Sequence, residues 1–314
     1  MMEQKFWIEK SKLNEIKWVK KYNLACDKWS KLTPNQIAIK YSYFSVNEHR
    51  KFINEICEKL NISLKGRGLE IGSGPGILSN SLIKIFNDID KIYLLEMVPN
   101  SFSLMKKVAK FNNTEKKLSC IIGDFNNLKF KDESLDFIVE FDAIHHSDDF
   151  DRTFKEISRV LKPGGILLCF DRGHPNYISS NQINDMLDIE YSDDYKKENN
   201  IALKKKYTRR MNGEHEPLIK DWINTGKKYK LSNSISIFYS KSFKHFLRSL
   251  YGLIVPYWMK KKLNKGINIT THYQIILGYL NINKSKELKT YSLNYKSKNK
   301  KSPNAKMVFL FEKS

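Results

Sequence analysis

Residues 68–76 read Gly-Leu-Glu-Ile-Gly-Ser-Gly-Pro-Gly and constrain the fold of this chain more than any other segment. Gly72, Gly74 and Gly76 stand at alternate positions, and residues 77–86 follow with apolar side chains at helical spacing. We therefore predict a tight turn from a strand into a helix. Glycine permits positive φ there and lets a ligand approach the bare backbone. The free N–H groups at the helix start favour a negatively charged ligand group.

Glycine-rich turns of this kind serve several nucleotide-like ligands, and some are purely structural. A nicotinamide site prefers the spacing Gly-x-Gly-x-x-Gly, whereas the three glycines here alternate, which disfavours a dehydrogenase. No Gly-Lys-Ser/Thr follows the glycines, which excludes a P-loop. The turn alone does not distinguish among the remaining ligands. The segments that follow it in the sequence narrow the choice of ligand.

Two of these downstream segments place an acid where an apolar strand is predicted to end. Residues 91–96 end in Glu96, and residues 120–122 run into Asp124 and Phe125. An acid at the end of the second strand of a doubly wound sheet can accept hydrogen bonds from two ribose hydroxyls. Taken singly, each acid also fits a solvated strand end or a Gly-Asp turn.

A third segment, residues 135–146, is predicted to be a buried strand that runs into a loop with one aspartate and two histidines: Asp142, His145 and His146. An amphipathic helix over residues 154–161 follows, and the sequence Pro-Gly-Gly at 163–165 stops it. Residues 166–171 are predicted to form a strand buried on both faces.

In this order, the motifs resemble those of class I S-adenosylmethionine (SAM)-dependent methyltransferases over roughly residues 62–171. The Leu-Lys-Pro-Gly-Gly unit and the Asp-Ala-Ile-His-His loop are similar to those of small-molecule methyltransferases of the quinone- and sterol-methylating type. The resemblance implies an α/β, Rossmann-like, doubly wound sheet of seven strands with SAM as cofactor. It also implies the cofactor-binding residues: Glu70, Gly72, Ser73, Gly74 and Gly76 at the amino acid part, Glu96 at the ribose with Met97 beside it, Asp124 and Phe125 at the adenine, and Phe141 and Asp142 near the sulfonium.

The formal net charge of +21 is unevenly distributed. Counted from the sequence, it is +5 over residues 1–60, −1 over residues 61–171 and +17 over residues 172–314. Such a field can attract nucleic acid, anionic lipid or a phosphorylated substrate. The richness in Lys, Asn, Ile, Tyr and Phe also fits a compositional background that raises Lys everywhere.

Composition bounds the environment of the chain as well. The four cysteines show no CxxC spacing, which is typical of reduced intracellular thiols and predicts no zinc site. The first residues lack the apolar run of a signal peptide. Because no segment reaches ~20 apolar residues, we expect a cytoplasmic protein without a membrane span. Peripheral membrane contact through the aromatic and basic residues 243–265 remains open.

Three regions are predicted along the chain. Residues 1–60 form an N-terminal helical lid, in which Asn47 caps a helix running to Leu60. Residues 61–171 form the SAM-binding core. Residues 172–314 combine substrate-recognition insertions with the last strands of the sheet, for which the candidates are 230–238 and 307–311. Residues 243–265 could be a substrate lid, a surface helix or a core helix, and 282–306 are expected to be a mobile loop.

Methyl transfer from a sulfonium is an in-line displacement in which the enzyme mainly positions the reactants. A hydroxyl acceptor benefits from a general base, and histidine suits this task near neutral pH. The candidate catalytic residues are His145, His146 and His174, and each could instead pack structurally. The sequence Glu214-His215-Glu216 lacks the His-Glu-x-x-His spacing of a metal site. We expect it to be a surface loop and predict no metal.

The acceptor is the least determined part. The insertions favour a small-molecule, sugar-linked or lipid-linked acceptor in a shaped pocket. One alternative is an RNA methyltransferase, suggested by the basic C-terminal part. Against it, residues 140–143 read Glu-Phe-Asp-Ala instead of the Asn/Asp-Pro-Pro-Tyr/Phe of many base-amino methylases. Another alternative is a SAM-binding regulatory subunit without turnover.

Overall fold

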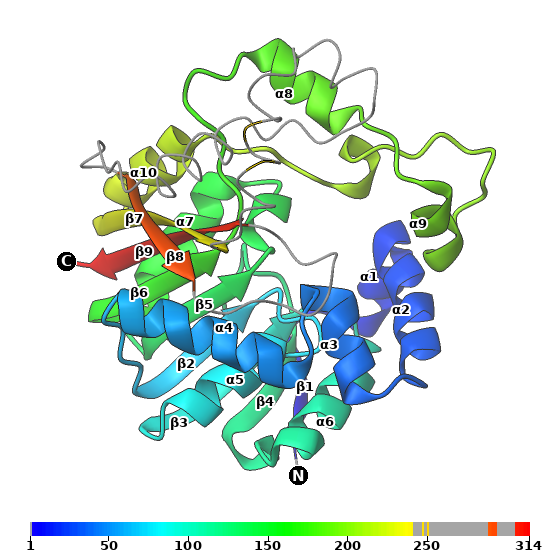
Figure 1. Cartoon of the computed structure of the whole chain (residues 1–314). Helices are drawn as coiled ribbons and strands as arrows, with labels where there is room; N and C mark the ends of the chain where they lie inside the picture. The colour runs from blue at the N-terminus through cyan, green and yellow to red at the C-terminus, as the bar shows by residue number, and fades with distance from the viewer. Residues whose placement is uncertain (1, 241–246, 248–249, 251–287, 294–304) are drawn as a thin grey trace.

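The computed structural model describes residues 2–240, 247, 250, 288–293 and 305–314 of the chain. The described strands form one sheet of nine strands in the order β1-β4-β3-β2-β5-β6-β9-β7-β8. Helices cover both faces of this sheet (Figure 1). The chain is thus a mixed α/β molecule with a mostly parallel sheet.

The centre of the sheet consists of five parallel strands: β2 (Gly66–Ile71), β3 (Ile89–Glu96), β4 (Leu118–Ile122), β5 (Leu135–Phe141) and β6 (Leu161–Phe170). Three helices connect them: α5 (Ile77–Ile85), α6 (Ser101–Asn112) and α7 (Phe150–Val160). The strand order reverses at β2, because β3 lies on one side of it and β5 on the other. The carboxyl ends of these strands therefore flank a crevice at a topological switch point, where ligands bind in sheets of this kind.

Alternate residues of the central strands pack into two separate cores. Ile138 of β5 belongs to a cluster with Phe154 of α7, whereas the next residue, Val139, belongs to a cluster with Leu82 of α5. All four side chains are fully buried. The continuous apolar run of β5 is explained by this arrangement, since a parallel strand with helices on both faces exposes neither side to water.

The sheet has nine strands, whereas seven were expected. The expected sixth and seventh strands are present as β7 (Leu231–Ser240) and β9 (Ala305–Lys313), and β9 runs antiparallel between β6 and β7. The two additional strands extend the edges: β1 (Gln4–Phe6) pairs with β4, and β8 (Leu288–Leu293) pairs with β7. β8 lies in the segment that was expected to be a mobile loop. Its Lys-Thr-Tyr-Ser core lacks the apolar run of a buried strand, and within the described part of the chain it pairs with β7 alone, as an edge strand does.

The N-terminal region is helical apart from β1, with α1 (Lys10–Glu15), α2 (Lys17–Trp29), α3 (Pro34–Ser42) and α4 (Val46–Lys59). The cap of α4 differs from the expected one. Ser45, not Asn47, is the N-cap, and its side chain accepts a hydrogen bond from the N–H of Glu48 while Glu48 reaches back. This reciprocal capping box satisfies two free donors of the first turn, which Asn47, already inside the helix, cannot do.

After β6 the chain forms α8 (Ser180–Leu187), α9 (Asp193–Glu198) and α10 (Ile219–Lys228) before it returns to the sheet at β7. Figure 1 shows α9 beside the N-terminal helices α1 and α2, and Lys40 of α3 contacts Glu198 of α9 at 3.0 Å. Residues 243–265, for which a lid or a helix was expected, lie outside the described residues except for 247 and 250. Among the described helices, none has the length and apolar character needed to cross a membrane.

Candidate functional site

A cavity of about 600 Å³ lies at the carboxyl ends of β2, β3, β4 and β5, and residues of α2 and α3 form part of its wall. Of the cofactor-binding residues expected from the sequence, all but Gly76 line it: Glu70, Gly72, Ser73, Gly74, Glu96, Met97, Asp124, Phe125, Phe141 and Asp142. Among the three histidine candidates, His146 lines the cavity, whereas His145 and His174 do not. The fold therefore brings together segments that are far apart in the sequence.

The turn after β2 requires glycine at three positions, two of which, Gly72 and Gly74, line the cavity. Gly72 and Gly74 have φ angles of +59° and +48°. A Cβ on Gly72 would lie 2.5 Å from the Cβ of Ala143, and one on Gly74 would lie 2.9 Å from the ring of Tyr41. Both positions need glycine for backbone conformation and for close approach. Gly76 is the N-cap of α5 and lies behind the cavity wall.

Glu70 is the penultimate residue of β2 and contacts the first turn of α5. Its carboxylate accepts hydrogen bonds from the backbone N–H of Ser79, at 3.0 Å, and from the Ser79 hydroxyl. Ser79 is the third residue of α5, so the carboxylate lies where the helix dipole favours negative charge. Burial raises the pKa of Glu70 to about 8, against the effect of both hydrogen bonds. Glu70 thus joins β2 to α5 at the floor of the cavity.

Glu96 ends β3, and three backbone N–H groups hold its carboxylate. Gly74 donates to Oε2 at 2.9 Å, while Met97 and Val98 donate to Oε1 at 2.8 and 3.2 Å. Burial raises the pKa of Glu96, and the three donors act in the opposite direction. The carboxylate is therefore fixed in orientation, and Oε2 keeps a free lone pair for a ligand hydroxyl.

The loop after β4 lies beside Glu96. The N–H of Gly123 donates to the carbonyl of Glu96 at 3.0 Å, and Asp124 accepts a hydrogen bond from the N–H of Asn126 at 2.8 Å. Asp124 and Phe125 are both half-buried in the cavity wall. A carboxylate and an aromatic ring at adjacent positions suit a planar, amino-bearing heterocycle, because one accepts a hydrogen bond while the other covers the ring face.

The hydroxyl of Ser73 is available for a hydrogen bond to a ligand. Its side chain is buried in the cavity wall, and its hydroxyl has no hydrogen-bond partner among the described residues. Nearly all buried polar groups in folded proteins have a partner. A ligand carboxylate or amino group would supply the missing one. Ser73, the diol-compatible carboxylate of Glu96 and the pair Asp124–Phe125 together fit the three chemical parts of SAM.

The loop after β5 forms the wall opposite Glu96. Asp142 has a positive φ of 55° and accepts a hydrogen bond from Lys306 at 2.5 Å. Lys306 comes from the start of β9, and its ammonium lies 4.5 Å from the ring centroid of Phe141. No sequence pattern distinguishes Lys306, because the contact spans more than half the chain and lysines are abundant throughout it.

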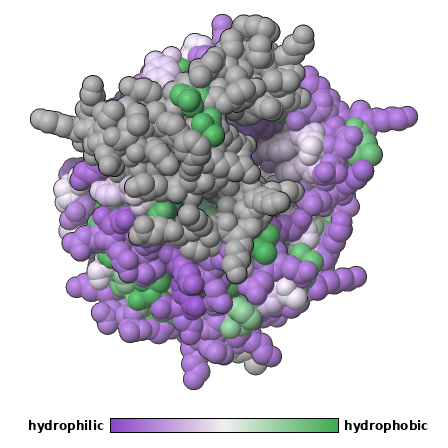
Figure 2. All heavy atoms as spheres, in the orientation of Figure 1, coloured by the Kyte–Doolittle hydropathy of each residue, from purple (hydrophilic) through white to green (hydrophobic). Residues whose placement is uncertain are grey.

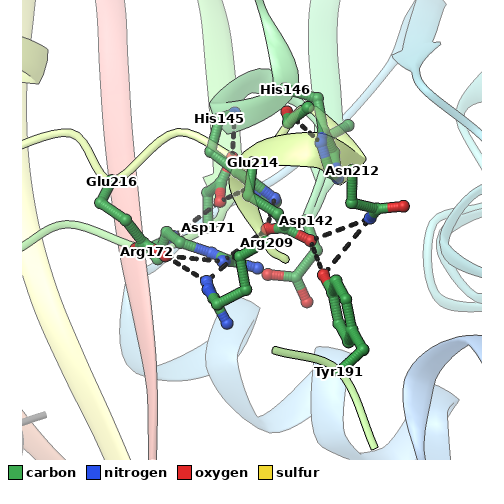
Figure 3. Close-up of polar contacts among 12 residues, drawn as sticks. Asp142, His145, His146, Asp171, Arg172, Tyr191, Arg209, Asn212, Glu214 and Glu216 are labelled. Atoms are coloured by element: carbon green, nitrogen blue, oxygen red, sulfur yellow. Dashed lines mark hydrogen bonds and ion pairs between the residues drawn. The ribbon is translucent and has the colours of Figure 1, made fainter. Parts of the chain in front are cut away.

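His145 is buried and held between two carboxylates. Its Nδ1 lies 2.6 Å from Asp171, and its Nε2 lies 3.4 Å from Glu214 (Figure 3). Burial lowers the pKa of His145, but the effect of Asp171 and Glu214 is larger and opposite, so the pKa is raised to about 9. His145 is therefore charged at neutral pH and has no access to the cavity.

His146, the next residue, has the opposite character. Its Nδ1 lies 2.9 Å from the carbonyl oxygen of Gly213, and its ring packs on that of His145 at a centroid distance of 4.1 Å with the ring planes tilted by 40°. Burial, followed by the charge of His145, lowers the pKa of His146. A carbonyl oxygen only accepts hydrogen bonds, so the proton of neutral His146 lies on Nδ1 and Nε2 keeps its lone pair.

The expected surface loop at 214–216 is instead part of a buried charge network, which corrects that prediction. Glu214 lies 2.8 Å from Arg172, and Glu216 contacts Arg209. Both glutamates are about nine-tenths buried. His174 also belongs to this network, because its Nε2 lies 2.6 Å from Glu216. The charges come from three separate segments, so the sequence pattern around Glu214 could not reveal their partners.

The network also includes a group of potential metal ligands. One atom each of His145, His146 and Glu214 lies within 4.8 Å of the others. However, Arg172 and Arg209 approach the Glu214 carboxylate at 2.8 and 3.6 Å, and His145 is itself a cation. Since these groups already neutralise Glu214, we assign no metal ion to this cluster.

Several cavity residues were not singled out from the sequence. His49 of α4 lines the cavity, hydrogen bonds through Nδ1 to Ser81 at 2.9 Å, and packs 5.3 Å from the ring of Phe141. Burial lowers the pKa of His49 to about 3. Aromatic side chains of the N-terminal helices complete the wall: Trp18, Tyr22, Trp29 and Tyr41. Their clustering with helical spacing was visible in the sequence, but it fits core packing equally well.

Comparison with protein families matches residues 69–169 to a methyltransferase domain. The chain is similar to a demethylmenaquinone methyltransferase of Staphylococcus saprophyticus, with 24% identity over 42% of this chain and 55% of the relative. It is also similar to a sterol 24-C-methyltransferase of Aspergillus fumigatus, with 29% identity over 40% of this chain and 32% of the relative. The aligned part thus spans about half or less of these curated relatives.

Among solved structures, the YcgJ protein of Bacillus subtilis matches with a TM-score of 0.49 and 15% identity, covering 84% of this chain and 98% of that chain. The matched family segment begins inside β2 and ends inside β6. It therefore contains every cavity residue from Glu70 to His146, while the segment 210–216 and the N-terminal helices lie outside it.

Proposed function

Because the chain carries a class I SAM-dependent methyltransferase domain, with distant similarity to menaquinone and sterol methyltransferases, we propose that it transfers the methyl group of SAM to a small-molecule acceptor. The observation that carries this proposal is the hydrogen bond from Gly74 to Glu96. It joins the glycine turn to the acid at the end of β3, so one cavity presents sites for the amino acid and the ribose at once.

We assign SAM to the cavity by the chemistry of its walls. The turn at Gly72–Gly74 and the unpartnered hydroxyl of Ser73 would hold the amino acid part. Glu96 would accept from the ribose, and Asp124 with Phe125 would hold the adenine. When bound, SAM supplies a methyl group on a positively charged sulfur. The aromatic rings of Trp18 and Tyr22 suit such a cation.

His146 is the general base in this proposal. It faces the cavity, it is neutral at physiological pH, and its Nε2 lone pair is directed away from Gly213. With SAM and acceptor bound, Nε2 of His146 would take the proton of the acceptor oxygen or nitrogen as the methyl group passes to it and S-adenosylhomocysteine is left as the other product. His145 serves this step indirectly. Together with burial, its charge lowers the pKa of His146, so His146 stays neutral.

A small, uncharged acceptor fits the cavity better than RNA. Among the described residues, the wall contains no Lys or Arg but five carboxyl groups, of which Glu70 has a pKa raised to about 8 and Asp142 is paired with Lys306: Glu70, Glu96, Asp124, Asp142 and Asp148. A phosphate group would meet these acids without an opposing cation in the described wall. The basic charge of residues 172–314 therefore does not by itself argue for a nucleic acid acceptor. A sugar- or lipid-linked small molecule remains compatible with this wall.

The decisive experiment combines binding and turnover. We expect calorimetric titration to give micromolar binding of SAM and of S-adenosylhomocysteine, and none of NADH. An acceptor screen with quinols, sterols and uncharged sugars should then yield a methylated product, with sugar nucleotides and lipid-linked glycans as the phosphate-bearing contrast. The absence of adenosyl binding would refute the proposal. Binding without transfer to any acceptor class, RNA included, would favour the regulatory subunit.

The role of His146 is tested with the His146→Gln variant. Loss of a general base should lower kcat by about 10²–10⁴-fold without a matching change in the affinity for SAM. His215→Gln is the matched control, because His215 is half-exposed and does not itself line the cavity, although it pairs with the wall residue Asp148 at 3.4 Å. Equal kcat values for His146→Gln and wild type would remove His146 from the mechanism.

A further inference from the structure

A short segment outside the matched domain determines how His146 is held. Residues 210–212 form a single 3-10 turn that ends at Gly213, whose φ is +74°. The carbonyl oxygen of Gly213 is the group that lies 2.9 Å from Nδ1 of His146. Both Asn212 and Gly213 line the cavity. The orientation of the imidazole thus depends on a loop that begins more than sixty residues after it.

Asn212 anchors one side of Gly213. Its Oδ1 accepts hydrogen bonds from Lys21 at 2.9 Å and from the hydroxyl of Tyr207 at 2.9 Å. Its Nδ2 donates to the hydroxyl of Tyr191 at 3.3 Å. Lys21 belongs to α2, and its ammonium also lies 5.0 Å from the ring centroid of Tyr207. Asn212 is therefore held jointly by the N-terminal region and by the segment that follows α8.

Glu214 anchors the other side. Its Oε1 accepts a hydrogen bond from the hydroxyl of Tyr191 at 2.7 Å, and its Oε2 accepts one from Arg172 at 2.8 Å. Arg209 approaches the same oxygen at 3.6 Å. Figure 3 shows these side chains converging on the Glu214 carboxylate beneath the two histidines. A buried carboxylate with this many partners has little freedom to move.

The position of the Gly213 carbonyl follows from these two anchors. Gly213 itself has no side chain, and a Cβ there would meet nothing within 4 Å. Its backbone N–H donates to the carbonyl of Arg210 at 3.1 Å, and apart from this turn bond its carbonyl is directed by the residues on either side. We propose that Asn212 and Glu214 are positioning residues, which fix the Gly213 carbonyl so that His146 carries its proton on Nδ1 and presents Nε2 to the acceptor.

This inference rests on the proposed function only in giving His146 the role of base. Its structural content is the location of one proton, which does not depend on any substrate. The charges around His146 agree with it: His145 and Arg172 disfavour a second proton on the ring, whereas Glu214 and the Gly213 carbonyl favour one. The ring is neutral on balance, so the question of which nitrogen carries the single proton decides whether it can act as a base.

The test is a nitrogen-15 NMR experiment on the histidine rings of the full chain, with His146→Gln to assign the signals. In the wild type, we expect the proton of His146 on Nδ1. In Asn212→Ala and in Glu214→Gln, we expect a mixture of the two tautomers. With a known acceptor, both variants should lower kcat by about tenfold or more while the KM for SAM stays within twofold, since second-layer hydrogen bonds of this kind contribute on this scale.

Glu216→Gln is the matched control, because Glu216 is equally buried and shares Arg172 and Arg209 but does not flank Gly213. It should keep the wild-type tautomer. Thermal unfolding of each variant shows whether it has lost its fold or only a hydrogen bond. Tyr191→Phe is a milder change, because it removes the hydroxyl that contacts both Asn212 and Glu214. A proton on Nε2 in the wild type, or an unchanged tautomer in both Asn212→Ala and Glu214→Gln, would overturn the inference. The expected tautomer without SAM binding would instead refute the proposed function alone.

Discussion

His145 and His146 are adjacent in the sequence but occupy opposite electrostatic environments. The single turn that carries them directs one ring toward Asp171 and the other toward the cavity. As a result, one ring is charged and the other neutral at the same pH. In many active sites, the surroundings shift the pKa values of two titratable groups in opposite directions. The two groups can then take different roles, one structural and one catalytic.

The charge of His145 should be visible in the pH dependence of stability. Its folded pKa is about 9, against an ordinary value of 6.5, so the stabilisation is complete below pH 6.5 and is lost as the pH rises through 9. We expect the free energy of unfolding of the wild type to fall over this window by about 3 kcal/mol more than that of His145→Gln. Denaturant titrations at pH 6.5, 8 and 9.5 measure the difference. Parallel curves for the two proteins would contradict the ion pair with Asp171.

Glu96 should contribute directly to cofactor affinity. Glu96→Ala removes the ribose acceptor and leaves the N–H groups of Gly74, Met97 and Val98 without their partner. We expect the Kd for SAM to rise by a factor corresponding to about 1–3 kcal/mol. Calorimetry on the folded variant measures it. An unchanged Kd, with wild-type circular dichroism, would exclude Glu96 from the ribose site.

At the scale of elements, the turn between β2 and α5 combines backbone conformation with close packing. Gly72→Ala introduces a Cβ at positive φ and places it against Ala143. Gly164→Ala has the same conformational penalty, since φ is +73°, but its Cβ meets nothing within 4 Å. We expect Gly164→Ala to cost about 1 kcal/mol of stability and to leave SAM binding intact. Gly72→Ala should destabilise more and weaken SAM binding, and equal effects of the two variants would show that the contact with Ala143 is unimportant.

The elements also show what a sequence can and cannot reveal. The strands from β2 to β6 and the residues Glu70, Glu96 and Asp124 were predictable, because turn chemistry and apolar runs are local properties. The two edge strands and the Ser45 cap were missed or misplaced because short, partly polar segments carry a weak pattern. The contacts of Asp142 with Lys306 and of His146 with Gly213 were out of reach, since nothing near either residue specifies a partner that distant.

At the scale of the whole molecule, charge is separated between the cavity and the remainder. The described cavity wall is acidic, whereas the chain carries +21 and hydrophilic residues cover most of the described surface seen in Figure 2. We expect RNA to bind weakly, with an affinity that falls steeply with salt, and not to compete with SAM. Fluorescence titrations measure the affinities for RNA and for SAM. They are made between 50 and 300 mM salt, roughly the range over which phosphate contacts are screened. Displacement of SAM by RNA, or methylation of RNA, would reverse this expectation.

The place of β9 in the sheet has a consequence for how the protein is made. β9 is formed by the last residues of the sequence, yet it lies between β6 and β7, and its Lys306 reaches Asp142. A chain emerging from the ribosome can form the turn, Glu96 and both histidines early, since folding proceeds from the N-terminus during synthesis. Its sheet, however, keeps the edge at β6 open until β9 has been synthesised. A product that lacks β9 would carry a nearly complete cavity together with an unpaired edge that invites association with other chains.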